Sequence, residues 1–186
     1  LDYLKVNIGE LFTKIIKRLE DVGIYGRIKE ISEYRGQKNI KLELKGPMFD
    51  GNLKNMSLIT INISLKEKAL YKAEQRKIFS QYMDIPAFDV FVMPLNELLA
   101  EKVRALLTRD KARDVYDVWF LLNKGAKLIP KDVNKKLKKY KMPFSTKYFI
   151  AKIDEKEKSW ENDLKGLILG NLPDFKYVKK EISEKI

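Results

Sequence analysis

The hydrophobic period of this chain changes at Pro94, and that change limits the folds it can adopt. Before Pro94 the clearest pattern is residues 59–65, where isoleucines and a leucine alternate with small polar residues. A period of two predicts a half-buried strand. After Pro94 the apolar residues recur three and four positions apart, which predicts amphipathic helices. Strands followed by helices indicate an α+β fold, with an antiparallel or mixed sheet first and a helical half second.

Shorter patterns complete this outline. We expect strands at 2–6, 24–34, 39–45, 59–65, 76–81 and 88–93, and helices at 9–21, 95–108, 111–123, 131–140, 145–153, 156–169 and 174–185. The length fits one domain with two lobes, 1–94 for the sheet and 95–186 for the helices, forming one compact unit. No apolar run is long enough to span a bilayer.

Two consecutive helical patterns, 95–108 and 111–123, carry charged residues among apolar ones. Lys102 has leucines four positions before and after it, so its ammonium lies on or beside the buried face, where a charge is costly unless paired. Asp114 and Asp117 lie in the first two turns of the second pattern. A lysine and two carboxylates at the junction of two helices indicate a site.

Composition excludes several kinds of chemistry. The chain has no cysteine and no histidine, which rules out disulfides, Ser-His-Asp catalysis and zinc sites built on those side chains. A metal site here would use oxygen ligands, hence Mg²⁺ or Mn²⁺. The absence of cysteine is consistent with a reducing cytoplasm. The net charge of +12 points to polyanions such as RNA, although a lysine-rich proteome would give the same charge.

The stretch AEKVRALLTRDKARDVYDVWFLL, residues 100–122, resembles the C-terminal signature of the AbiEii/AbiGii-type toxin nucleotidyltransferases. These are enzymes of type IV toxin–antitoxin systems and distant relatives of the DNA polymerase β superfamily. In outline the signature is A-E-K, an arginine, then R-D-x-x-D. It is filled here by residues 100–102, by Arg104 and Arg109, and by residues 113–117. Weaker similarity covers most of the chain.

The resemblance implies a function and a set of roles. It implies transfer of a nucleotide from an NTP to an RNA acceptor, probably tRNA, with Mg²⁺ as cofactor and a cognate antitoxin as a possible partner. Lys102 would neutralise triphosphate charge. Asp117 and Asp114 would orient that lysine or accept a proton. The side chains that would clamp phosphates are Arg104, Arg109 and Arg113.

Each of these residues also has a structural interpretation. The stem of Lys102 can pack on the core while its head reaches solvent. Asp114 suits a helix N-terminus, and Asp117 can pair with Arg113 four residues earlier. The arginines can be ordinary exposed helix residues, which contribute little to stability.

The chain departs from the family pattern at the metal site. Members carry a Gly-Gly-Thr/Ser loop and a D-L-D-F segment, and no Gly-Gly-Thr occurs here. Leu1, Asp2 and Tyr3 match the tail of D-L-D-F, so we expect that the numbering begins inside this motif and that Asp2 is its second metal carboxylate. Asn62 occupies the position of a third carboxylate, where an amide is a poor Mg²⁺ ligand. We therefore expect residues 1–186 to be inactive, or nearly so, without the upstream segment.

A lysine-rich run follows the signature. Residues 131–141 contain six lysines, of which Lys135, Lys136, Lys138 and Lys139 form a candidate nucleic-acid patch with Tyr140 available for stacking. The alternative is a solvated helix face. Two other functions stay open: a nucleotide- or RNA-binding domain without metal chemistry, as Asn62 indicates, and a helical half that docks an antitoxin.

Overall fold

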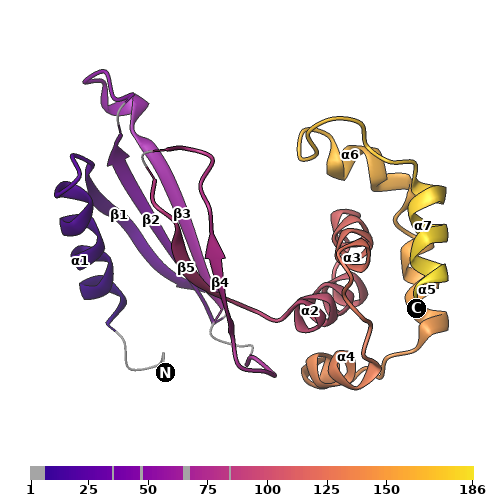
Figure 1. Ribbon diagram of the computed structural model, residues 1–186. Helices are drawn as coiled ribbons and strands as arrows, with labels where there is room; N and C mark the ends of the chain where they lie inside the picture. The colour runs from indigo at the N-terminus through magenta and orange to yellow at the C-terminus, as the bar shows by residue number, and fades with distance from the viewer. Residues whose placement is uncertain (1–6, 35, 47, 65–67, 84) are drawn as a thin grey trace. The chain divides into compact units, whose positions relative to one another are not determined.

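The computed structural model describes residues 7–34, 36–46, 48–64, 68–83 and 85–186 (Figure 1). Antiparallel sheets occupy the N-terminal half and helices follow, so the predicted α+β class is confirmed. The chain divides into two compact units, Leu1–Lys68 and Ala69–Ile186, which we call the N-terminal and C-terminal units. The lobe boundary at 94/95 was placed by hydrophobic period alone, whereas the unit boundary follows contacts within the chain.

The N-terminal unit is a helix on a three-stranded sheet. It contains α1 (Ile8–Glu20), β1 (Tyr25–Tyr34), β2 (Gln37–Lys45) and β3 (Ser57–Ser64), with antiparallel strands in the order β1-β2-β3 and a short 3₁₀ turn, η2 (Leu53–Asn55), before β3. The side chain of Asn7 caps α1 by accepting from the backbone N–H of Glu10. The core forms where α1 buries Phe12 and Ile16 with three alternate residues of β2, namely Ile40, Leu42 and Leu44.

The intervening residues of β2 point to the other face of this sheet, which is polar. Lys41 Nζ lies 2.7 Å from Glu30 Oε2 of β1. Glu43 accepts from Arg27 at 2.8 Å. Asn62 of β3 is exposed and lies opposite Asn39 in the strand register. The alternation predicted for 59–65 is present at Ile61 and Ile63, which pack toward the core, whereas Ile59 is 44% exposed and Leu65 lies outside the described residues.

The C-terminal unit begins with an antiparallel hairpin, β4 (Glu74–Ile78) and β5 (Phe88–Val92). The helices that follow are α2 (Leu95–Thr108), α3 (Arg113–Asn123), α4 (Pro130–Leu137), α5 (Thr146–Asp154), α6 (Trp160–Leu164) and α7 (Phe175–Glu184), with 3₁₀ turns η3 (Lys138–Tyr140) and η4 (Glu157–Ser159). Their shared core is built from the apolar stripes of these helices. None of the helices in the described ranges is long and apolar enough to cross a membrane.

One predicted helix is much shorter than expected. The pattern at 156–169 becomes the turn η4 and the short helix α6, which ends at Leu164. Gly166 follows with a φ of 78°, a left-handed conformation that glycine adopts without steric cost and that commonly ends helices. The helix predicted at 131–140 is likewise divided, into α4 and η3. The other predicted helices agree with the structure to within one or two residues at each end.

Candidate functional site

Lys102 and Asp117, the first two residues expected at the site, contact each other. Lys102 lies on α2 and Asp117 on α3, and Lys102 Nζ is 2.7 Å from Asp117 Oδ2. Their side chains are 32% and 35% exposed, so the pair is accessible to a ligand. Asp117 therefore pairs across the two helices, and within the described residues it forms no ion pair with Arg113, its neighbour along α3.

Asp114 has a different environment from Asp117. It is fully buried and accepts two hydrogen bonds from Arg109, from Nε at 2.6 Å and from Nη2 at 2.5 Å. This is a forked arginine–carboxylate contact, the strongest geometry for such a pair. Asp114 also lies in the first turn of α3, where a negative charge is favourable. Asp114 thus holds the Arg109 side chain, and Asp117 is the carboxylate that contacts Lys102.

The turn between α2 and α3 is held from a distant part of the chain. Lys156, whose side chain is buried, donates to Asp110 Oδ1 at 2.5 Å. The backbone N–H of Ala112 donates to Asp163 Oδ2 at 2.9 Å, which caps the start of α3. The sequence did not single out Lys156 or Asp163, because they lie far from the signature. Arg113, the first residue of α3, is exposed at the end of this turn.

Glu101, the acidic residue of A-E-K, connects α2 to α4. Its Oε2 accepts from Arg104 Nε and Nη2 at 3.1 and 3.0 Å, and its Oε1 lies 2.7 Å from Lys136 Nζ. Lys136 also donates to the fully buried Glu97 at 2.6 Å. Burial raises the pKa of Glu101, but the positive charge of Lys136 beside one oxygen and the hydrogen bonds from Arg104 to the other outweigh it and leave the pKa below its usual value. Glu101 therefore holds the Arg104 guanidinium within the protein.

Lys136 is a correction to the expected surface patch. Its side chain is only 4% exposed and lies between two carboxylates, Glu97 and Glu101. Burial lowers its pKa, and the hydrogen bonds to these two carboxylates more than reverse that effect, so the pKa is raised and the lysine stays charged. The helix period explains the difference, since Lys135 and Lys136 point about 100° apart around α4.

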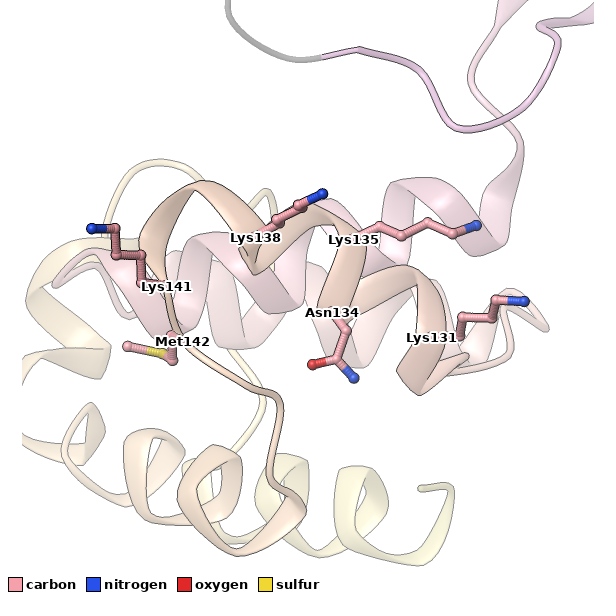
Figure 2. A pocket seen from close by; sticks show the side chains of 6 residues that line it. All are labelled: Lys131, Asn134, Lys135, Lys138, Lys141 and Met142. Atoms are coloured by element: carbon pink, nitrogen blue, oxygen red, sulfur yellow. The ribbon is translucent and has the colours of Figure 1, made fainter.

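The exposed lysines of this region line a shallow, open hollow of about 780 Å³. We call it the lysine hollow and define it by Lys131, Asn134, Lys135, Lys138, Lys141 and Met142. Figure 2 shows these side chains along α4 and the segment that follows it. Lys135 and Lys138 were expected there, Lys131 and Lys141 were not, and Lys139 is exposed but does not line the hollow.

Lys141 has an unusual backbone conformation. Its φ of 53° and ψ of 33° are left-handed, and no other non-glycine residue in the described ranges has a positive φ. This conformation costs an L-residue about 1–2 kcal/mol. Glycine or asparagine is the usual residue where a helix ends this way. Glycine at this position would therefore make the protein more stable, because glycine has no Cβ to clash in the left-handed conformation.

The expected metal ligands do not form a site in the described chain. Asp2 lies outside the described residues. Asn62 is exposed on β3, and the carboxylates of the neighbouring strands, Glu30 and Glu43, are held by ion pairs with basic residues. Residues 7–186, apart from the undescribed positions, contain no group of three acidic side chains arranged to hold a metal ion. These residues do not fit Mg²⁺, and we derive no chemical step through it.

The segments that match A-E-K and R-D-x-x-D thus lie on α2 and α3 of an α+β chain, where Lys102 and Asp117 contact each other. The family model described as "Nucleotidyl transferase AbiEii toxin, Type IV TA system" matches residues 1–181. The chain therefore belongs to this family of nucleotidyltransferase toxins. Membership implies an NTP substrate and an antitoxin partner. No curated protein matches the chain significantly, and no solved structure does.

Proposed function

We propose that the protein transfers a nucleoside monophosphate from an NTP to an RNA acceptor such as tRNA. The observation that supports this best is the accessible ion pair between Lys102 and Asp117, formed by the two ends of the family signature. A positioned ammonium is the kind of group that stabilises charge developing on phosphate oxygens during phosphoryl and nucleotidyl transfer.

In the proposed reaction a 3′-hydroxyl oxygen of the RNA attacks the α-phosphorus of the NTP. A new phosphodiester bond forms, the bond between the α-phosphorus and the bridging oxygen breaks, pyrophosphate leaves, and the hydroxyl proton passes to a base. Lys102 neutralises triphosphate charge, and Asp117 orients Lys102 by holding one of its three donors. Arg113, exposed at the start of α3, adds positive charge beside the turn, while Asp114 fixes Arg109 through its forked contact.

The test is incorporation of label from α-³²P NTPs into total tRNA in the presence of MgCl₂. Residues 1–186 contain no Gly-Gly-Thr/Ser sequence, so the assay compares them with a longer protein that carries such a loop in front of Leu1, which we call the extended protein. We expect labelling by the extended protein and none by residues 1–186. Lys102→Ala should lower the labelling rate of the extended protein by about 10²–10³-fold. Removal of one hydrogen-bond donor that stabilises developing charge has an effect of this size in other enzymes.

Lys165→Ala is the matched control, since Lys165 is an exposed lysine at the end of α6, outside the signature. It should leave labelling unchanged. Labelling that survives Lys102→Ala at the wild-type rate contradicts the assigned role. Robust labelling by residues 1–186 contradicts the expectation that these residues are inactive alone.

A second function is favoured by one observation. Asn62 is an exposed amide at the position where the family pattern has a carboxylate. A domain that binds nucleotide or RNA without transferring it would need no carboxylate there. Saturable NTP binding by the extended protein, with no labelling of any RNA, would support this function in place of transfer.

A further inference from the structure

We propose that the lysine hollow binds the phosphodiester backbone of a nucleic-acid strand, with Lys131, Lys135, Lys138 and Lys141 contacting successive phosphates. The inference that this strand is the RNA acceptor rests on the proposed function. The site itself differs from the patch expected from sequence, because it excludes the buried Lys136 and includes two lysines at its ends.

The charge of the hollow is the first argument. None of the described residues that line it is acidic. The nearest carboxylate along α4, Asp132, is 1% exposed and accepts from Tyr71 Oη at 2.7 Å and from Lys135 Nζ at 3.3 Å. Within the described chain no ion pair engages Lys131, Lys138 or Lys141. Their charges are therefore available to an anion from outside.

The spacing of the cations is the second argument. Lys131, Lys135 and Lys138 lie on successive turns, so their Cα atoms are separated along the helix axis by about 6 and 4.5 Å. A row of this kind suits a chain of regularly spaced charges better than one compact anion. The hollow is shallow and open, which allows a strand to pass along it. Contacts of this type position a nucleic acid without reading its sequence.

Tyr140 adds an aromatic surface at the end of the row. Its side chain lies in η3, immediately before Lys141, and is 45% exposed. The Arg104 guanidinium lies 5.7 Å from the ring centroid and donates to the hydroxyl at 3.3 Å. The ring is thus held in place while part of it stays open to solvent. Exposed aromatic rings beside cationic grooves stack on bases of single strands.

The backbone of Lys141 gives the proposal its sharpest test. A residue selected only for stability would be glycine at this position, since glycine adopts the left-handed conformation without steric cost. If Lys141 is there for its charge, Lys141→Gly should raise or preserve the melting temperature and weaken RNA binding. If Lys141 served only to end the helix, Lys141→Gly would change the melting temperature and the RNA affinity in the same direction, or it would leave the RNA affinity unchanged.

The experiment measures anisotropy of a fluorescein-labelled RNA hairpin with a single-stranded 3′ end, without NTP or Mg²⁺, at salt concentrations from about 50 to 200 mM. The triple variant K131Q/K138Q/K141Q should bind at least about tenfold more weakly at low salt. Its log–log salt slope should be shallower by about two to three, because three phosphate contacts are lost. The matched control is K158Q/K165Q/K176Q, which removes the same charge from exposed positions outside the hollow.

The control triple should stay within about threefold of wild type, since only long-range attraction is reduced. Equal losses in the two triples overturn the proposal, as does wild-type affinity in the hollow triple. Tighter binding of poly-glutamate or of phosphatidylserine vesicles, lost in the hollow triple, overturns the choice of nucleic acid. If the hollow triple loses RNA binding and the extended protein labels no RNA, the hollow is supported and transfer is contradicted. Labelling with unchanged binding in the triple overturns the hollow alone.

Discussion

The buried cation Lys136 links α2 to α4. An ammonium removed from water is stable only when its charge is paired and its donors are satisfied. Glu97 accepts a hydrogen bond from Lys136 at 2.6 Å, and Glu101 Oε1 places a second negative charge 2.7 Å from the ammonium. Glu97 in addition accepts from the backbone N–H groups of Leu70 and Tyr71, at 2.7 and 3.1 Å. The segment before β4 is thereby attached to the same charged cluster as the A-E-K residue Glu101.

Replacement of Lys136 by methionine should be strongly destabilising. The side chain keeps a similar length, but two buried carboxylates lose their partner, and breaking a buried ion pair in this way typically costs about 3–5 kcal/mol. Urea unfolding followed by circular dichroism would measure the change. Lys139→Met, at an exposed position three residues later, should change the free energy of unfolding by under about 0.5 kcal/mol. Similar small losses in both variants would show that the cluster contributes little.

Elements formed by local patterns were predictable, whereas their contacts across the chain were not. The strands β1, β2 and β3 and the helices α2 and α3 follow from apolar period, because burial of one face requires that period whatever the partner is. Helical spacing and the family signature both placed Lys102 and Asp117 near the junction of two helices. The buried position of Lys136 was not expected, since a run of lysines gives no indication of which one faces two carboxylates on another helix.

The α2–α3 turn shows the same limit at the level of elements. Its conformation depends on Lys156 and Asp163, which come from the segment that was predicted as one continuous helix. The short helix α6, ended by Gly166, is what brings Asp163 to the start of α3. The apolar residues of 156–169 have helical spacing, which predicted one continuous helix. That spacing gave no sign that the helix ends before Gly166.

Asp163→Ala should weaken the start of α3. The Ala112 N–H would lose its acceptor at 2.9 Å, and removal of a capping side chain typically costs about 1 kcal/mol, within a range of 0.5–2 kcal/mol. Thermal unfolding would measure the change, with Asn162→Ala as the control because Asn162 is the exposed neighbour on α6. If the two variants melt at the same temperature, the contact from Asp163 does not stabilise α3.

At the scale of the whole molecule, most buried apolar residues of the described ranges belong to one of two clusters. One contains residues from α1 and the three-stranded sheet, and the other contains residues from Leu99 onward. Within the described residues, the second core receives no buried residue from the N-terminal unit. Apolar burial is the main source of stability, so a unit with its own core has the means to fold alone.

The C-terminal unit, residues 69–186, should therefore fold when expressed by itself. We expect a helical circular-dichroism spectrum and one cooperative thermal transition. A fragment that begins after Tyr71 should melt lower, because it removes the backbone donors to Glu97 and the Tyr71 hydroxyl that donates to Asp132. A non-cooperative transition for residues 69–186 would show that this core is insufficient without the N-terminal unit.

Both tryptophans of the protein belong to the C-terminal unit. Trp160 is buried and donates to the backbone oxygen of Pro173 at 3.0 Å, and Trp119 donates to Glu181 Oε2 at 3.3 Å. Indole emission responds to the polarity around the ring, so the intrinsic fluorescence of this protein reports the state of its helices and not that of the three-stranded sheet. Far-ultraviolet ellipticity reports both units. Recorded on one sample, the two signals separate the unfolding of one unit from that of the other without any label.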